Sequence, residues 1–278
     1  MIKIGFVDFF LSEWHANNYP TWIKETGKEF EVAYAWAEKE VSPYDGITTN
    51  QWCETMGVQQ CGSIEEVCEK SDVIVILSPD NPENHLPYAK IVLPYGKPTY
   101  IDKPFAHTKE DAEEMLALAQ KYNTPFFSTS ALRYATELDE VEECTAVATL
   151  GGGAGVEQYI IHQIEMIVKK LGLGAQKIMA RKLAKNQYHF LISYSDGRAA
   201  MMHYAAGAPF EITMSPKGED NVFHSAITSA MFEGLIQDML RFFETKNASF
   251  DASQTMEANK IYAASIRAKE TLDTWIEV

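Results

Sequence analysis

The most informative stretch of this 278-residue chain is GKPTYIDKP, residues 96–104. Its middle part, Thr99 to Ile101, predicts a short strand, which is followed by Asp102, Lys103 and a proline. A lysine just past the carboxyl end of a strand lies where α/β sheets bind ligands, and the proline restricts where that lysine can point. Because lysine is usually exposed, a solvated surface lysine beside a turn is the alternative interpretation.

Strand and helix patterns alternate around this stretch, over residues 1–130. Pro20 favours the start of a helix, SIEE at residues 63–66 is a capping box, and VIVIL at 73–77 fits a buried strand. This alternation predicts an α/β domain with a Rossmann-like, doubly wound parallel sheet. We expect its strands at residues 2–9, 30–37, 58–61, 73–77, 99–101 and 125–128, and its helices at 20–25, from 63, and at 84–93 and 108–121.

The pattern changes after Arg133. Residues 188–194 alternate between aromatic or aliphatic and other side chains, Asp196-Gly197 fits a two-residue hairpin turn, and residues 199–205 fit an antiparallel return. Such hairpin strands predict a second domain of α+β type, residues 131–278, with a mixed or antiparallel sheet. Its other elements are expected as a strand at 143–150, a flexible lead-in at 151–155, a helix at 157–171 and two closing helices around 231–243 and 261–272.

Composition and charge limit the partners and the location. The net charge of −15 argues against nucleic acid and anionic membrane surfaces, which need basic patches. We find no apolar run of membrane-spanning length and no signal pattern. The four cysteines lack a C-x-x-C pair, which favours reduced thiols in the cytoplasm. No histidine pair has the spacing of a catalytic metal site, so we expect no metal.

The order of the motifs resembles the glucose-fructose oxidoreductase and inositol dehydrogenase family, Gfo/Idh/MocA. Each match alone is weak, but they follow one another in the family's order along nearly the whole chain. The matching pieces are GV at 57–58, SIEEV at 63–67, SDVIVI at 71–76, Ser78-Pro79 with His85, residues 96–104, the triple glycine at 151–153 leading to HQIE at 162–165, and YSDGRA at 194–199.

The resemblance implies an NAD(P)-dependent oxidoreductase of sugars, polyols or similar alcohols. Carried over by position, the catalytic roles belong to Lys103 and His162. Hydride loss from an alcohol needs a base for the hydroxyl proton, and histidine titrates in the useful range. A nearby lysine can stabilise negative charge that develops on oxygen. The implied contacts to NAD or NADP are Asp8, Phe10, Glu38, Ser78, Pro79, His85 and Asp102, and those to the substrate are Arg133, Gln158 and Glu165.

The first turn departs from the family's G-x-G-x-x-G. Asp8, Phe10 and Glu13 stand where the glycines belong. Glycines there permit a tight turn, close approach to the pyrophosphate and helix packing, and a carboxylate about 4 Å from a phosphate would cost roughly 1–4 kcal/mol. Either a dinucleotide binds in an unusual way, or the chain no longer binds one. The aromatic residues of this turn either pack in the core or fill the former cofactor cleft.

Three further residues leave alternatives open. Glu38 follows the second strand, where an acid favours NAD over NADP, but it also fits a surface charge. Arg133 fits a substrate contact or a salt bridge at a domain interface. His162 shares a helix face with Gln158 and Glu165, which points either to solvent or into a polar cleft. The family often has an aspartate at the position of Gln158.

These observations lead to one preferred function and two rivals. We expect an NAD(P)-dependent oxidoreductase that moves hydride to or from a sugar-like or polyol substrate. The glycine-free turn motivates a redox-inactive member that binds a small molecule or a partner in the same cleft, and a non-redox enzyme such as a lyase is the third possibility. We also expect a trimmed second domain and a homodimer or higher homo-oligomer formed through its sheet.

Overall fold

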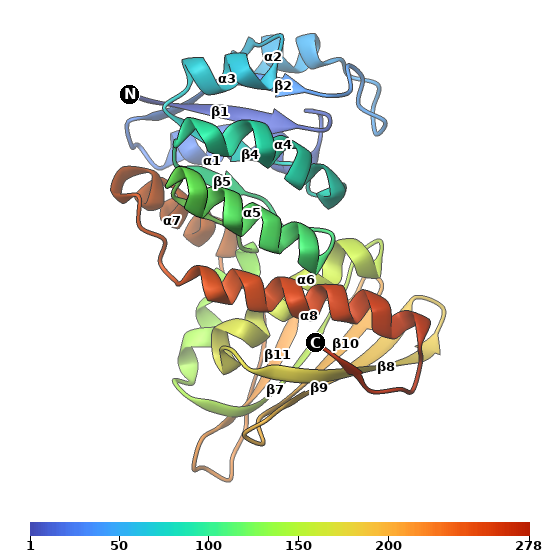
Figure 1. Ribbon diagram of the computed structural model, residues 1–278. Coiled ribbons are helices and arrows are strands. Elements are labelled where there is room, and N and C mark those ends of the chain that lie inside the picture. The colour runs from blue at the N-terminus through green and yellow to red at the C-terminus, as the bar shows by residue number, and fades with distance from the viewer. The chain divides into compact units, whose positions relative to one another are not determined.

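Six parallel strands form the sheet of unit 1, which comprises residues 1–128 and 236–249 of the computed structural model; the structure describes residues 1–278. The strands lie in the order β3-β2-β1-β4-β5-β6, of which Figure 1 labels β2, β1, β4 and β5. Because β2 and β4 flank β1, the strand order reverses at β1, where open α/β sheets bind ligands. The strands are β1 (Ile2–Asp8), β2 (Phe30–Ala37), β3 (Gln59–Gln60), β4 (Val73–Ile76), β5 (Thr99–Ile101) and β6 (Phe126–Phe127).

Helices cover both faces of this sheet. Right-handed crossovers place α1 and α2 on one face and α3, α4 and α5 on the other. Trp52 of α2 lies against Phe6 of β1, with ring centroids 6.4 Å apart, and donates a hydrogen bond to Asn17 of α1. The helices are α1 (Trp14–Glu25), α2 (Thr49–Met56), α3 (Ile64–Lys70), α4 (His85–Val92) and α5 (Lys109–Tyr122), with short 3₁₀ turns at Pro82–Asn84 and Leu93–Tyr95.

The final helix of unit 1 comes from far along the chain. Helix α7 spans Met231–Thr245, and its residues from Ile236 onward belong to unit 1. Phe242 and Phe243 of α7 pack against Phe127 and Phe30, with ring centroids 4.8 and 6.4 Å apart. These aromatic contacts join α7 to the two halves of the parallel sheet.

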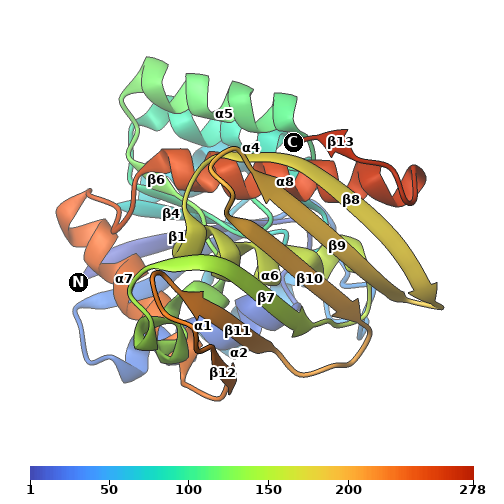
Figure 2. The same cartoon turned by 90° about the horizontal axis from the view of Figure 1, so that it is seen from below.

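Unit 2, residues 129–235 and 250–278, is built on a seven-stranded mixed sheet. The strand order is β12-β11-β7-β10-β9-β8-β13, and only the pairing of β7 with β10 is parallel. Figure 2 shows the long strands side by side, with α6 and α8 along one face. The elements are β7 (Cys144–Gly151), α6 (Val156–Leu171), β8 (Ala175–Ala184), β9 (Gln187–Tyr194), β10 (Ala199–Ala205), β11 (Glu211–Pro216), β12 (Phe223–Ala226), α8 (Ala252–Glu270) and β13 (Ile276–Glu277), with 3₁₀ turns at Ala131–Tyr134 and Thr136–Glu140.

The two faces of the unit 2 sheet differ. Alternate residues of each strand, such as Phe190, Met202 and Met214, are buried in the core beneath α6 and α8. The residues between them, such as Leu191 and Met201, line a shallow hollow of about 230 Å³ on the other face. This alternation is what a sheet with one helix-covered face requires.

The expected fold class is confirmed: a parallel α/β sheet is followed by a mixed sheet with helices. One prediction about the helices is wrong. Pro20 does not begin the first helix but lies inside α1, which starts six residues earlier at Trp14. The pattern-based prediction also missed α2, β8, β11, β12 and β13. None of the helices combines the length and the apolar character that crossing a bilayer requires.

Candidate functional site

Lys103 follows β5 at the carboxyl edge of the unit 1 sheet. Its side chain is buried, and its Nζ lies 3.5 Å from the carbonyl oxygen of Pro79, which follows β4. The β4 and β5 strands pair through Ile76 and Ile101, so their ends lie side by side. The sheet therefore brings together Lys103 and Pro79, two residues that the sequence had placed in the site.

Asp102, the acid before this lysine, points into unit 1. Its carboxylate pairs with Nδ1 of His15 on α1 and accepts a hydrogen bond of 3.2 Å from the hydroxyl of Tyr100. Burial alone would raise the pKa of Asp102, but the His15 imidazole and the Lys103 ammonium hold it at about 2. Asp102 therefore fixes the first turn of α1 to the end of β5.

Asp8 connects the ends of β1 and β4. Its Oδ1 accepts hydrogen bonds from the backbone N–H of Phe9 at 2.7 Å and of Ser78 at 2.9 Å, while its buried Oδ2 has no hydrogen-bond partner. Ser78 has a left-handed backbone with a φ of 73°, and its Oγ donates to the carbonyl of Asn81 at 2.9 Å. Burial, with repulsion from Glu13, raises the pKa of Asp8 well above its usual value.

Glu13 occupies the N-terminus of α1. It is the N-cap residue, and its Oε2 accepts from the N–H of His15 at 2.8 Å while its Oε1 accepts from the N–H of Ala16. The side chain is buried, and burial raises its pKa despite the nearby His15. Glutamate is not among the preferred N-cap residues, so the sequence alone gives no signal for this cap. Glu13 and His15 are the two site residues whose contacts the sequence reasoning missed.

The remaining predicted cofactor residues are fixed within unit 1. Phe10 is buried and packs edge-on against Tyr44, with ring centroids 5.1 Å apart. Exposed Glu38 follows β2 and accepts a hydrogen bond of 2.9 Å from the hydroxyl of Tyr88. Phe10 is thus buried, whereas Glu38 keeps an exposed carboxylate at the carboxyl edge of the sheet.

His85 has no ring nitrogen left over. Its Nδ1 lies 3.0 Å from the carbonyl of Phe105, and its Nε2 lies 2.6 Å from the carbonyl of Leu77. The ring is fully buried, which lowers its pKa. His85 therefore joins the end of β4 to the segment after Lys103, and it supports the carboxyl edge of the sheet from a buried position.

His162 lies on α6 in unit 2 and is nine-tenths buried. Its Nδ1 is 2.5 Å from the hydroxyl oxygen of Ser130, and its ring packs edge-on against Phe210 and Tyr159. An imidazole whose Nδ1 is engaged in this way is held in one orientation. Ser130 is a third site residue that the sequence reasoning missed, because 32 residues separate it from His162.

Arg133 and Glu165 form a buried ion pair inside unit 2. Nη1 of Arg133 lies 3.1 Å from Oε2 of Glu165, which also accepts a hydrogen bond of 3.0 Å from Thr129. The guanidinium also contacts Gln254 and lies over the ring of Phe250, 3.8 Å from its centroid. Burial raises the pKa of Glu165, although Arg133 opposes the shift.

The helix face that carries the predicted substrate residues is mostly buried. Glu165 is 3% and His162 9% exposed, whereas Gln158 is half-buried near the start of α6. The amide oxygen of Gln158 lies close to Gly155, because a Cβ added to that glycine would be 2.3 Å from it. The face therefore does not point into solvent, which was one of the two possibilities.

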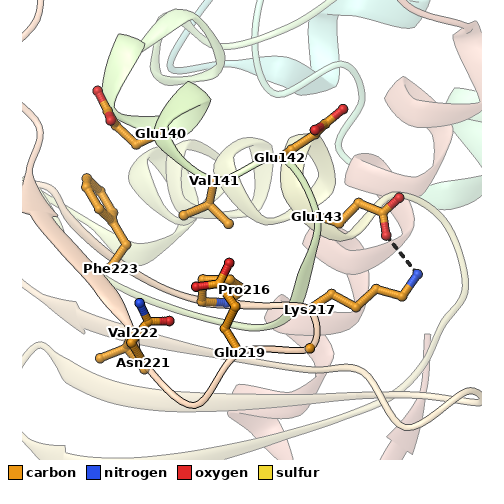
Figure 3. A pocket seen from close by; sticks show the side chains of 11 residues that line it. Glu140, Val141, Glu142, Glu143, Pro216, Lys217, Glu219, Asn221, Val222 and Phe223 are labelled. Atoms are coloured by element: carbon orange, nitrogen blue, oxygen red, sulfur yellow. Dashed lines mark hydrogen bonds and ion pairs between the residues drawn. The ribbon is translucent and has the colours of Figure 1, made fainter.

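A second hollow lies in unit 2 and holds none of the predicted site residues. It has a volume of about 780 Å³ and lies between residues 140–143 and the turn after β11. Figure 3 shows the carboxylates of Glu140, Glu142 and Glu219 around it, with Glu143 paired to Lys217 at 2.7 Å. The hollow is acidic and open.

Comparison with known families agrees with this geometry. Residues 27–130, which include Glu38, Asp102 and Lys103, match the family model described as the Gfo/Idh/MocA oxidoreductase family with an NAD-binding Rossmann fold. The match to this family therefore rests on residues 27–130 of unit 1. Among curated proteins, none is significantly similar to it in sequence.

Solved structures of dehydrogenases share the fold over the whole chain. The apo scyllo-inositol dehydrogenase from Lactobacillus casei has a TM-score of 0.80 at 14% identity, covering 100% of this chain and 98% of that one. The same enzyme with NAD(H) and scyllo-inositol has a TM-score of 0.78 at 16% identity, covering 100% and 99%. The UDP-N-acetylglucosamine 3-dehydrogenase from Acidithiobacillus ferrooxidans has a TM-score of 0.78 at 11% identity, covering 98% of each. At these identities the likeness shows the fold alone.

The residues of this chain fit only part of a dinucleotide. The exposed carboxylate of Glu38 suits ribose hydroxyls at the end of β2. A diphosphate, however, needs the free N–H groups at the start of α1, and Glu13 already occupies two of them. The nucleoside end of the cofactor therefore fits unit 1, whereas the diphosphate does not fit the first turn as it stands.

Proposed function

We propose that this protein is an oxidoreductase that uses NAD(H) to oxidise or reduce an alcohol carbon of a sugar-like or polyol substrate. The observation that carries the proposal is the family match over residues 27–130, inside which Lys103 follows β5 at the ligand-binding edge. The fold shared with an inositol dehydrogenase and a UDP-sugar dehydrogenase supports the substrate class. Glu38 supports NAD over NADP, because a carboxylate at that position repels a 2′-phosphate.

Two groups are proposed to take part in the chemistry. The Lys103 ammonium in unit 1 can donate a hydrogen bond to a substrate oxygen and stabilise negative charge on it. His162 in unit 2, with Nδ1 engaged by Ser130, can exchange a proton through its other nitrogen. We propose that Arg133 and Glu165 support the substrate-binding surface of unit 2 through their ion pair, since each already has a charged partner.

Titration with NADH and NADPH tests the proposal directly. Saturable binding of NADH in the micromolar range, followed by calorimetry, would support it and justify a screen of sugars and polyols. Weaker binding of NADPH would support the role of Glu38. An absence of binding by both up to millimolar concentration would reject the proposal.

A specific observation favours a second candidate, a redox-inactive member that binds a small molecule. Glu13 and Asp8 place two buried carboxyl groups at the first turn, where an NAD-dependent relative would hold phosphate. Such a protein would retain a ligand without turnover. Mass spectrometry of small molecules released from the purified protein distinguishes the two candidates when NADH does not bind.

We also propose that the protein forms a homodimer or higher homo-oligomer in the cytoplasm. The face of the unit 2 sheet away from α6 and α8 supports the assembly, because small and apolar side chains line its hollow. The four cysteines, all buried free thiols, support the reducing location. Light scattering tests the assembly, and a monomer at micromolar concentration would contradict it.

A further inference from the structure

The start of α1 is the place where this chain departs most from a dinucleotide-binding unit. In such units the N–H groups at the start of the helix after β1 point at the diphosphate and bind it. Here the N–H groups of His15 and Ala16, the second and third residues of α1, both donate to the carboxylate of Glu13. One carboxylate therefore uses the donors that a phosphate would need.

The position of Glu13 is fixed from several sides. Its backbone N–H donates to the carbonyl of Leu11 at 2.8 Å, and its own carbonyl accepts from Asn17 at 2.9 Å. The first turn of α1 is held as well, because the ring of His15 pairs with Asp102 and stacks on Tyr19, with centroids 5.1 Å apart. The carboxylate is thus a fixed part of the fold, and Glu13 as a whole residue is only 4% exposed.

Asp8 places a second buried carboxyl group near Glu13. Asp8 ends β1 at the same edge, and one of its carboxylate oxygens is buried without a hydrogen-bond partner. The His15 ring faces Asp102, and the Lys103 ammonium lies near the Pro79 carbonyl. A bound diphosphate would therefore add two negative charges where two carboxyl groups already lie.

We propose that Glu13 is an internal substitute for the diphosphate at the α1 N-terminus and determines which nucleotides unit 1 accepts. The inference rests on the proposed function, since it concerns the same nucleotide edge. A ligand gains affinity there from its nucleoside part and gains none from its diphosphate until the Glu13 side chain is removed.

Two probes and three variants test this proposal. Adenosine carries only the nucleoside part, whereas ADP-ribose adds the diphosphate. Glu13→Gln removes the charge and keeps an N-cap acceptor, and Glu13→Ser removes the charge and the bulk while keeping a preferred cap. Glu25→Gln removes an exposed charge from the far end of the same helix and serves as the matched control. Thermal melting of each variant checks that it is folded.

We expect the wild type to bind adenosine and ADP-ribose with affinities within threefold of each other. Glu13→Ser should tighten ADP-ribose binding at least tenfold and adenosine binding less than twofold, with Glu13→Gln in between and Glu25→Gln unchanged. If the wild type binds ADP-ribose far more tightly than adenosine and Glu13→Ser adds nothing, the inference is overturned while the NAD-dependent function stands. If neither ligand nor NADH binds the wild type or Glu13→Ser, both are overturned.

Discussion

Asp102 and His15 form a buried ion pair that joins the end of β5 to the first turn of α1. Asp102 has no exposed surface and His15 is 7% exposed. The pair thus holds the residue before Lys103 in place from within unit 1. The Asp102 carboxylate therefore stabilises the fold of unit 1.

Replacing Asp102 by Asn should destabilise the protein strongly. The substitution leaves the partner His15 in a buried site without its carboxylate, and breaking a buried pair in this way costs about 3–5 kcal/mol. Urea denaturation measures the loss. Glu31→Gln, an exposed change on β2 of the same unit, should stay within about 0.5 kcal/mol of the wild type. An equally small effect of Asp102→Asn would contradict the role of the pair.

Asp8 should give stability an unusual dependence on pH. Its folded pKa lies well above its usual value, so the native state holds a proton that the unfolded state has already released. Stability contributed by such a group is full below the unfolded pKa of about 3.9 and is lost as the pH rises through the folded pKa.

Replacing Asp8 by Asn should remove that loss. An asparagine Oδ1 can still accept from Phe9 and Ser78, and it carries no proton to release. We expect a gain of at least about 1 kcal/mol in the free energy of unfolding at pH 8, and a smaller gain at pH 5. Denaturation curves between pH 5 and 8 measure it. If the free energy of unfolding of Asp8→Asn fell with pH as steeply as that of the wild type, groups other than Asp8 would cause the decline.

Much of the fold could be predicted because its strands carry local signals. The bounds of β2, β5 and β10 agree with the sequence pattern residue for residue, since buried β-branched and aromatic runs and a hairpin turn mark strands without tertiary information. Helix α2 also had a signal that the prediction did not use. Thr48 and Gln51 form its capping box, and Gly57 ends it in a left-handed conformation.

The site was less predictable because its contacts join residues far apart in the chain. His15 and Asp102 are 87 residues apart, and Arg133 and Gln254 are 121 apart. The sequence marked Glu13 only as a missing glycine, since glutamate is not a typical cap. Periodicity similarly showed that α7 has an apolar face without showing which unit that face contacts.

Gly152 should tolerate no side chain. The triple glycine was expected as a flexible lead-in, but a Cβ at Gly152 would lie 2.4 Å from the carbonyl oxygen of Ala205 on β10, a backbone atom that cannot rotate away. We expect Gly152→Ala to cost about 1–3 kcal/mol, the usual cost of overpacking. Gly62→Ala is the control, because its Cβ would meet nothing closer than the flexible Glu66 carboxylate at 3.5 Å. Similar melting temperatures for the two variants would contradict the close approach.

Arg133 and Glu165 should behave as one structural unit. Glu165→Leu or Arg133→Met alone leaves the other buried charge without its partner, and we expect each to cost about 3–5 kcal/mol. The double variant Arg133→Met with Glu165→Leu replaces the pair by apolar groups, and it should recover most of that loss. Chemical denaturation of the four proteins measures the coupling. If the single costs simply add in the double variant, the pair is not the interaction that stabilises this part of unit 2.

Lys103 and His162 should both be needed for turnover once a substrate is found. Lys103→Met removes the ammonium that would stabilise charge on the substrate oxygen, and His162→Gln removes the proton carrier; each should lower kcat about 10²–10⁴-fold, the usual range for acid–base groups. Lys90→Met, an exposed change on α4, is the matched control.

The partner of His162 allows a finer test of the same prediction. Ser130→Ala removes the hydroxyl beside Nδ1, so it should lower kcat less than His162→Gln and also move the pH profile of kcat, whereas Ser130→Thr should restore both. A loss that Ser130→Thr restores without any change in the pH profile would mean that Ser130 only supports the fold. Full turnover by both Lys103→Met and His162→Gln would remove these two residues from the site.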